Sequence, residues 1–293
     1  MEEYAQNSGQ RDEEGNRLVQ NSETNGRFHT DWLNMMYPRL LLARDFLSND
    51  GIIFISIDEN ENINLGKLCD EIFGYSNKIG EFIRKTKTMT GDEEHGFDLQ
   101  HDYLLAYCKN SSDIKLIGKK KTYQGYGNPD NDPQGDWCMA DPSAKSGGET
   151  TYFGIENPYT HKIDYPPEGR YWAFSKKTLQ DYIKSGRIVF KSSHKENERG
   201  FIFKRYKSSL KSNFEPVHSL TFAENEYMNS IATAELKKLF QTAVFNYPKP
   251  TSMIRNLIEY SQADLIMDFF SGSATTAEGV IEANRHDCKK RKF

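Results

Sequence analysis

Hydrophobic residues recur along the chain with two periods, and together they predict alternating helices and buried strands. Leucine and methionine at helical spacing predict a helix over 31–47. The isoleucine-rich run 52–57 is short and bounded by glycine and aspartate, which predicts a buried strand. A second helix is expected at 61–73, and further strands at 79–84 and 103–108. This order of elements is typical of a parallel α/β sheet.

The same pattern returns after residue 241. A helix is expected from residue 251, and the apolar run 264–270 predicts another buried strand. The run leads into the small-residue turn 271–274, and a helix starts at 275. Small residues let a backbone approach a ligand closely, and the first N–H groups of a helix can bind it. The stretch therefore predicts either a site for a nucleotide-like cofactor or a tight strand–helix turn without a ligand.

A polar cluster, Asp58-Glu59-Asn60, follows the strand 52–57. Asp58 and Asn60 lie just beyond its carboxyl end, where open α/β sheets bind their ligands. This position makes both residues candidates for the active site. The same residues are also typical of the cap and first turn of the next helix, and the sequence leaves both interpretations open.

The middle of the chain has a different character. Six of the ten prolines fall within 129–167, where periodicity is weak and aromatic residues are dense. We expect an inserted α+β unit, with Trp137, Trp172 and Phe174 in its core or on a base-contacting face. The expected division is a polar lead-in at 1–30, a first α/β part at 31–114, the insertion at 115–240 and a second α/β part at 241–293.

Charge is spread unevenly. The formal net charge is −4, from 38 basic and 42 acidic side chains, but residues 184–213 hold nine lysines and arginines against two glutamates. Such a block can bind a polyanion, and its interleaved aromatic residues can stack on bases. A solvated charged face and a half-buried strand remain alternatives. The candidate DNA contacts are Lys191, Lys195, Arg199, Lys204, Arg205 and Lys207.

Composition excludes several classes of protein. No apolar run approaches the ~20 residues of a membrane helix, and the acidic N-terminus MEEYAQNSGQRDEEGN has no signal-peptide core. The four cysteines lie far apart without a C-x-x-C pair, so we expect neither a metal site nor a disulfide framework. Free thiols favour a reducing cytoplasm.

Several motifs resemble one family when they are taken in order. D-F-F-S-G-S-A-T-T at 268–276 resembles the S-adenosylmethionine motif D-x-F-x-G-S-G-T-T of the amino-group DNA methyltransferases, and departs from it at Ala274. N-Y-P-K-P-T-S-M-I at 246–254 looks like the partner motif that helps to hold the cofactor. The segments 35–47, 50–61, 99–110 and 156–175 are similar to the adenine-modifying, type III restriction-modification group. The resemblance covers the chain from about residue 4 to its end.

This resemblance implies a permuted methyltransferase: an incomplete Rossmann-like α/β sheet whose catalytic half precedes an inserted target-recognition domain and whose cofactor half follows it. The implied partners are double-stranded DNA, a restriction (helicase–nuclease) subunit and a second modification subunit. The implied S-adenosylmethionine contacts are Pro248, Lys249, Pro250, Asp268, Phe270, Gly272, Ser273, Thr275 and Thr276.

The catalytic motif of that family, D-P-P-Y, is missing. N-P-Y at 157–159 lacks a proline, and D-Y-P-P at 164–167 has the wrong order and place. We therefore expect a member truncated at both ends, which does not methylate DNA alone and is weakly stable without an upstream strand. One alternative is a sequence-specific DNA-binding module without chemistry. Another is a nicotinamide enzyme, which needs an acid about 20 residues beyond Gly272, where the chain has Lys292.

Overall fold

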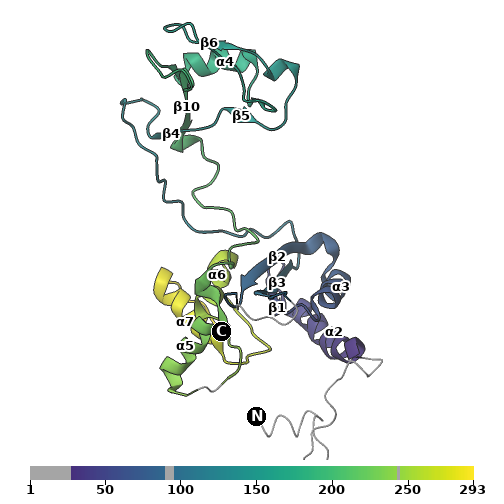
Figure 1. Ribbon diagram of the computed structural model, residues 1–293. Helices are drawn as coiled ribbons and strands as arrows, with labels where there is room; N and C mark the ends of the chain where they lie inside the picture. The colour runs from purple at the N-terminus through teal and green to yellow at the C-terminus, as the bar shows by residue number, and fades with distance from the viewer. Residues whose placement is uncertain (1–27, 90–95, 243–244) are drawn as a thin grey trace, which may run out of the picture. The chain divides into compact units, whose positions relative to one another are not determined.

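A computed structural model describes residues 28–89, 96–242 and 245–293 (Figure 1). The chain divides into two compact units, Met1–Lys119 with Glu215–Phe293 (unit 1) and Lys120–Phe214 (unit 2). Unit 2 is thus inserted into unit 1. It lies within the predicted insertion 115–240 but ends earlier, at Phe214. The predicted polar lead-in 1–30 falls almost wholly outside the described residues.

Unit 1 is built on a three-stranded sheet in the order β1 (Ile52–Ile57), β3 (His101–Cys108), β2 (Lys78–Lys85). All three strands were predicted, but the expected parallel pairing is wrong, because β3 is antiparallel to both neighbours. The connections explain the directions. β1 reaches β2 through α3 (Asn62–Phe73), a helical crossover that leaves these two strands parallel to each other. The described parts of the connection from β2 to β3 contain no helix, so β3 runs back beside β2.

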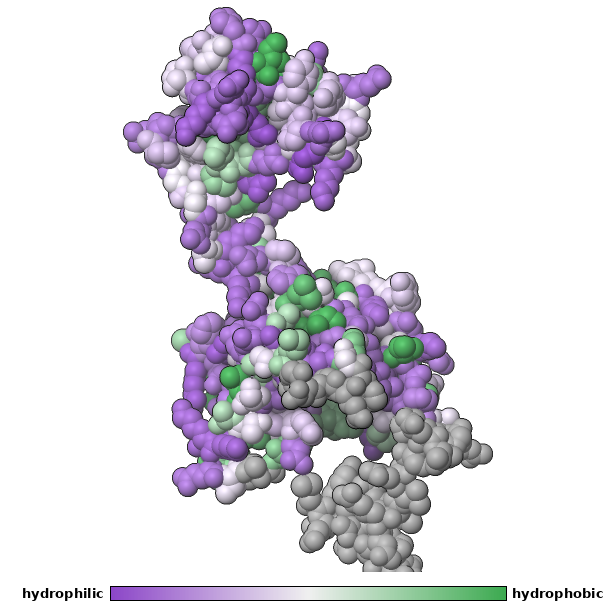
Figure 2. Space-filling model, viewed as in Figure 1, coloured by the Kyte–Doolittle hydropathy of each residue, from purple (hydrophilic) through white to green (hydrophobic). Residues whose placement is uncertain are grey.

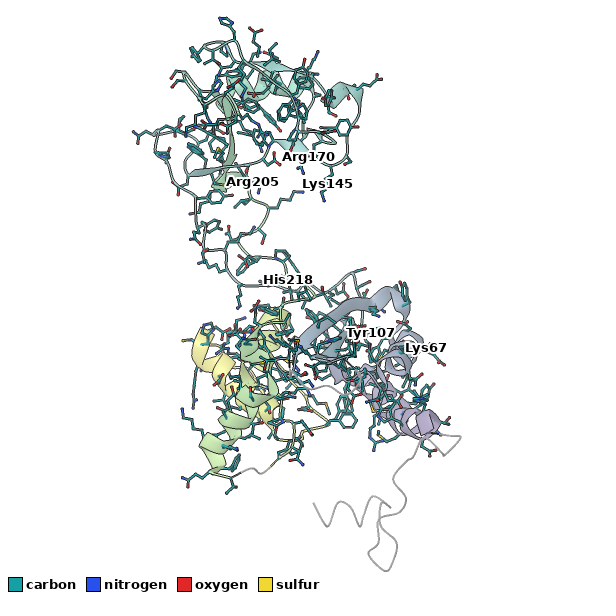
Figure 3. All side chains as sticks on the ribbon, in the orientation of Figure 1. Lys67, Tyr107, Lys145, Arg170, Arg205 and His218 are labelled. Atoms are coloured by element: carbon teal, nitrogen blue, oxygen red, sulfur yellow. The ribbon has the colours of Figure 1, made fainter. Side chains whose placement is uncertain are left out.

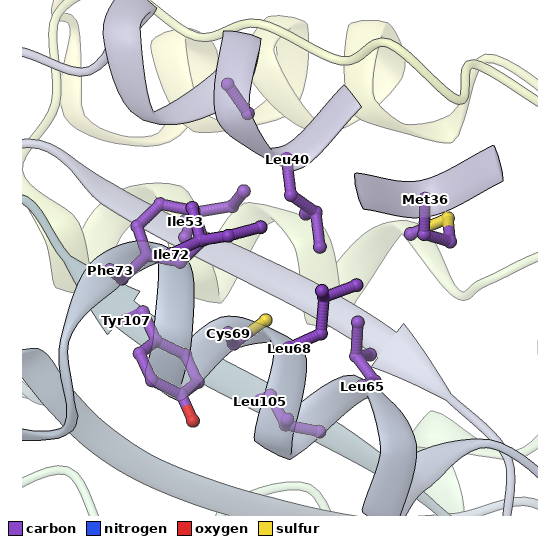
Figure 4. Packing of buried hydrophobic residues seen from close by; sticks show 11 residues of the cluster. Met36, Leu40, Ile53, Leu65, Leu68, Cys69, Ile72, Phe73, Leu105 and Tyr107 are labelled. Carbon is purple, nitrogen blue, oxygen red and sulfur yellow. The ribbon is translucent and has the colours of Figure 1, made fainter. Parts of the chain in front are cut away.

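One face of this sheet is covered by α2 (Phe28–Phe46) and α3, whose apolar side chains form the first core cluster (Figure 4). Leu40 of α2, Leu65 of α3 and Leu105 of β3 are each at most 1% exposed. Burying a leucine contributes about 1.5–3 kcal/mol, so this cluster holds the two helices against the strands. Burial also raises the pKa of the Cys69 thiol to about 12, which leaves the thiol protonated and inert.

The other face is covered by residues from the C-terminal part of the chain. Phe82 and Leu104 of the sheet pack with Tyr227, Met253 and Leu257, which lie on η4 (Asn225–Tyr227) and α6 (Thr251–Ser261). This packing explains why unit 1 resumes well before residue 240. Unit 1 is therefore a mixed α/β layer structure, completed by α5 (Asn229–Phe240) and by α7 (Thr275–Asp287), which packs on α6.

The segment 264–270 differs from the prediction of a buried strand. Its only strand-like pairing in the described structure is a parallel bridge between Leu265 and Lys292. Ile266 packs against the cluster formed by α6 and α7, whereas Leu265 and Met267 are 73% and 60% exposed. The alternation is that of a strand with one covered face. The prediction of burial fails because only the face that carries Ile266 packs on another layer, while the face that carries Leu265 and Met267 has no cover in the described structure.

Unit 2 is an α+β unit of short strands. A three-stranded sheet has the order β4 (Trp137–Met139), β10 (Phe201–Tyr206), β9 (Ile188–Phe190). Two small ladders pair β5 (Ser143–Ala144) with β8 (Tyr171–Trp172) and β6 (Ile155–Glu156) with β7 (Ile163–Asp164). One helix, α4 (Lys176–Lys184), packs on β9.

Aromatic side chains form the core of unit 2. Trp172 and Phe174 are buried in it together with Phe201 and Phe203, so two of the three aromatic residues expected in the core lie there. Trp137 is only half-buried and lies outside this cluster. The aromatic residues at 201 and 203 therefore serve burial rather than base stacking.

Within the described ranges 28–89, 96–242 and 245–293, no helix has the length and apolar character needed to cross a membrane.

Candidate functional site

The turn 271–274 enters α7 through two residues with left-handed backbone conformation. Gly272 has φ +50° and Ala274 has φ +59°. Glycine adopts this conformation freely, whereas an L-residue pays about 1–2 kcal/mol. Ala274 is the N-cap of α7 and offers no side-chain cap. In the described structure the N–H groups of Thr275 and Thr276 have no hydrogen-bond acceptor, so the positive end of the helix dipole is available to a ligand.

Asp268 fixes the shape of this turn. Its Oδ2 accepts a hydrogen bond from Thr276 Oγ1 at 2.6 Å, and its Oδ1 accepts one from the Phe270 N–H at 2.9 Å. The Ser273 and Thr275 hydroxyls are hydrogen-bonded to each other at 2.8 Å. The carboxylate thus ties the extended segment to the first turn of α7, and the two hydroxyls line the entrance to the helix.

The second motif, 246–254, continues into the first residues of α6. Pro248 and Pro250 are buried and flank the half-buried Lys249. Pro250 is the N-cap of α6, and Thr251 donates hydrogen bonds from its N–H and its Oγ1 to Oε2 of Glu235, both at 3.0 Å. Glu235 lies on α5, so the start of α6 is held against α5 and Lys249 is fixed between them.

These two motifs meet at a hollow of about 220 Å³. Its walls come from α5, from residues 249 and 251, and from the turn into α7. The lining side chains include Glu235, Leu236, Leu239, Phe240, Lys249, Thr251, Ser273, Thr275, Glu278 and Ile281. The hollow therefore combines an apolar wall with one ammonium group, two carboxylates and several hydroxyls.

Of the predicted cofactor contacts, Lys249, Ser273 and Thr275 line this hollow directly. The remaining six are not among the lining residues: Pro248, Pro250, Asp268, Phe270, Gly272 and Thr276. Several of them shape it nevertheless. The prolines flank Lys249, and Asp268 holds Thr276.

Lys249 belongs to a charged cluster at one edge of the sheet. Arg84 donates from Nε and Nη2 to the two oxygens of Asp102 at 2.7 and 2.6 Å. The Lys249 Nζ lies 3.7 Å from Oδ2 of the same aspartate. Burial lowers the pKa of Lys249 and the Arg84 charge lowers it further, whereas Asp102 opposes the change. Arg84 also donates to the Tyr227 carbonyl, which connects the cluster to η4.

The candidate Asp58 lies at the same edge. Ile57 pairs with Tyr103 in the β1–β3 register, and one further step places Asp58 opposite Asp102. Asp58 also acts on the Lys249 charge. Its Oδ1 accepts a hydrogen bond from the Asn60 N–H at 3.1 Å, and both residues are exposed before α3. The structure thus brings Asp58 near Lys249. Asn60 forms part of the turn before α3, through its N–H bond to Asp58.

The six basic residues proposed for DNA contact have different environments in unit 2. Lys204 is only 3% exposed and binds Asp130 and Asp132, so its charge is compensated inside the fold. Lys191 pairs with Glu198, and Arg199 lies over the ring of Trp172. Lys207 lies over the ring of Tyr123 at 4.4 Å. Lys195 and Arg205 are exposed.

The sequence motifs did not mark two residues that line the hollow, nor Phe245 beside the neighbouring turn. Glu235 and Glu278 line the hollow, but they lie on helices outside the two motifs. Phe245 reaches Gly272, where a Cβ would lie only 3.2 Å from the Phe245 ring. Phe245 immediately precedes the 246–254 motif, which was the one signal available for it. The glutamates gave no signal, because only the packing of α5 and α7 brings them to the same hollow as Lys249.

Comparison with known proteins identifies the family. The profile described as DNA methylase matches residues 7–287. The chain is 30% identical over 313 residues to the Mod subunit of the type III restriction-modification enzyme EcoPI from Escherichia phage P1, an alignment that covers 96% of this chain and 47% of that protein. It is 31% identical over 277 residues to the StyLTI Mod subunit of Salmonella typhimurium, and this alignment covers 90% of this chain and 40% of that subunit. The type II methyltransferase M.KpnI of Klebsiella pneumoniae is 29% identical over 287 residues, and this alignment covers 90% of this chain and 66% of that enzyme.

The chain spans about half the length of the Mod subunits that it matches. Its matched region includes both motifs that form the hollow and all of unit 2. The chain belongs to the DNA methylase family, together with the Mod subunits of type III restriction-modification enzymes.

Proposed function

We propose that this chain forms the cofactor-binding and DNA-reading part of a site-specific adenine methyltransferase of a restriction-modification system. The observation that carries the proposal is the convergence of the 246–254 and 268–276 motifs on one hollow. An inserted unit 2 then serves as the target-recognition domain for double-stranded DNA. The relatives named Mod subunits favour a restriction subunit and a second modification subunit as partners, in the cytoplasm.

S-adenosylmethionine fits the chemistry of the hollow. Its amino-acid end carries an ammonium and a carboxylate, which Glu278 and Lys249 complement. A hollow of about 220 Å³ is smaller than the ~300–1,000 Å³ of sites that enclose a drug-sized ligand. We therefore assign it to the methionine portion, whose carboxylate Lys249 and the Thr275 N–H would hold. When bound, the cofactor supplies a methyl group activated on a sulfonium.

The segment 264–270 has the pattern of a further strand of a Rossmann-like sheet. Its neighbour α6 packs Met253 and Leu257 against the β-sheet, and Ile254 and Ile258 against the α7 cluster with Ile266. One helix thus covers both β1 and this segment. We therefore place a further strand of the sheet between them, where it would pair with the free edge of 264–270.

Methyl transfer to adenine needs more than a bound cofactor. The amino group of adenine is a poor nucleophile, and the D-P-P-Y motif that accepts its N–H bonds in the family is absent from these 293 residues. Because the acceptor would not be positioned, we expect no methyl transfer from labelled S-adenosylmethionine to DNA by this chain alone. Detectable labelling of DNA would overturn this part of the proposal.

Calorimetric titration with S-adenosylmethionine tests the cofactor site without relying on activity. We expect saturable binding by the wild-type chain, and a loss of at least tenfold for Lys249→Ala and for Glu278→Gln, because charged hydrogen bonds contribute about 1.5–3 kcal/mol. Lys238→Ala is the matched control, since Lys238 is an exposed lysine of α5. If wild type binds DNA but no S-adenosylmethionine, the alternative of a DNA-binding module without chemistry is favoured.

A further inference from the structure

Unit 2 contains a second hollow, of about 460 Å³, beside the β5–β8 ladder. It lies outside the basic block 184–213, and three of its residues belong to the segment 156–175, to which the sequence assigned no binding role. On the side that Figure 2 shows, the surface of unit 2 is mostly hydrophilic. The lining residues are Gly148, Glu149, Tyr152, Gly169, Arg170 and Tyr171.

Arg170 is held rigidly at this hollow. Its Nε donates to Ser143 Oγ at 2.7 Å, and its Nη2 donates to Asp141 Oδ2 and to the Ser143 carbonyl, both at 3.0 Å. Its Nη1 has no hydrogen-bond partner in the part of the chain that the structure describes. A guanidinium fixed on two nitrogens loses little entropy when the third meets an acceptor.

A second cation stands directly across from Arg170. The β5–β8 register pairs Ala144 with Tyr171, and one further step places Lys145 opposite Arg170. Both side chains extend from the same side of unit 2 (Figure 3). Like charges at opposed positions repel each other, and Lys145 is exposed and has no ion-pair partner among the described residues. Arg170 is already paired with Asp141 at 3.0 Å, so Lys145 is the uncompensated cation of the two and favours an electronegative ligand.

An aromatic surface adjoins the two cations. Tyr152 is 50% exposed, and its ring centroid lies 6.0 Å from that of Tyr165 and 6.3 Å from that of Tyr171. The two glycines of the hollow leave open space before the backbone, because a Cβ at Gly148 or Gly169 would meet no atom within 4 Å. The backbone at these two glycines is therefore open to a ligand.

We propose that this hollow contacts the target DNA: Arg170 and Lys145 donate to acceptor atoms of the nucleic acid, and Tyr152 packs on a base or sugar. This inference rests on the proposed function of unit 2 and adds a contact surface outside the basic block. In that block Lys204 is neutralised by two aspartates and Lys191 by Glu198. Glu149 adds a carboxylate to the hollow, which can accept from a base amino group but would repel a phosphate.

Binding of the full 293-residue chain to duplexes with a randomised core tests the proposal, with affinity measured at several salt concentrations. Wild-type binding establishes the proposed function first. We then expect Tyr152→Leu to weaken binding by about 5- to 100-fold and Lys145→Ala to weaken it measurably. Matched controls are Tyr159→Leu and Lys177→Ala, which change an exposed tyrosine and an exposed lysine of the same unit.

Arg170→Lys distinguishes the two kinds of acceptor. If Nη1 reads a base edge, the selected sequences change at one position. If it contacts a phosphate, selection is unchanged and all sequences bind more weakly. Either result supports the hollow as a contact site. Wild-type binding with Tyr152→Leu, Lys145→Ala and Arg170→Lys all equal to the controls would overturn the inference and leave the proposed function intact. A wild-type chain that binds no DNA would refute the proposed function itself.

Discussion

The Nζ of Lys249 lies 3.7 Å from Oδ2 of Asp102, an oxygen that already accepts from Arg84. The lysine therefore shares one carboxylate with a buried guanidinium. Burial and the Arg84 charge lower its pKa, which means that its charge is unfavourable in the free chain. The charge of Lys249 therefore lowers the stability of the free chain. Because Lys249 lines the cofactor hollow, we infer that this charge serves cofactor binding.

Lys249→Met is therefore expected to raise the melting temperature of the free chain at pH 7 while weakening binding of S-adenosylmethionine. The sign follows from linkage: a lysine whose folded pKa is lowered binds fewer protons in the folded state, so wild-type stability rises as pH rises from the folded pKa toward the unfolded value. Calorimetric melts at pH 7 and pH 10 measure both effects. A lower melting temperature of the variant at pH 7 would contradict this assignment.

Arg84 is expected to be critical for the stability of unit 1. It is 1% exposed and bridges β2, Asp102 of β3 and the Tyr227 carbonyl. Arg84→Met leaves the Asp102 carboxylate poorly compensated, and breaking a buried pair costs about 3–5 kcal/mol. Urea denaturation measures the loss. The double variant Arg84→Met with Asp102→Leu removes both charges and should recover part of it; a double variant less stable than the single one would argue against a charge effect.

Ala274→Gly is expected to stabilise the chain by about 1 kcal/mol, because alanine is strained at a positive φ and glycine is not. Ala274 has φ +59° at the start of α7. The matched control is Ala277→Gly inside the same helix, which should destabilise by about 1 kcal/mol. Chemical denaturation of the three proteins provides the comparison. An equal loss of unfolding free energy from both substitutions would mean that residue 274 is helical in solution.

The exposed stripe of 264–270 should promote self-association. Leu265 and Met267 are largely exposed on one face of the segment, and unpaired apolar edges associate. We expect Met267→Lys to reduce association measured by light scattering, with stability changed by less than about 0.5 kcal/mol. Ile266→Lys is the control on the packed face and should destabilise the fold. Unchanged scattering by Met267→Lys would exclude the stripe as the contact.

Acidic pH should lower the stability of unit 2 through the cluster of Lys204 with Asp130 and Asp132. A hydrogen bond from Lys204 lowers the pKa of Asp132 to about 2. A depressed carboxyl pKa contributes stability above the unfolded value near 3.9 and loses it as pH falls through the folded value. We expect Trp137 fluorescence to report a transition between about pH 4 and 2. In Lys204→Met the transition should shift to higher pH, whereas Lys177→Ala should leave it unchanged.

Local pattern predicted much of this protein. The isoleucine run 52–57 became β1 at the predicted residues, because a short apolar run between glycine and aspartate has few other ways to be buried. The turn before Thr275 also starts a helix as expected. The motif order predicted the family, which the match over residues 7–287 confirms.

Other features depended on tertiary structure. The sequence does not encode strand direction locally, and β3 runs antiparallel because its connection to β2 lacks a crossover helix in its described parts. Charge counting suggested Lys204 for DNA contact, but the fold buries it between two aspartates. Lys145 gave no sequence signal, and Arg170 lay in the segment 156–175 without a binding role, since the two residues become neighbours only through the β5–β8 register. Sequence thus determined elements and motifs, whose signals are local, whereas only packing decided which charges are compensated and which are free to bind.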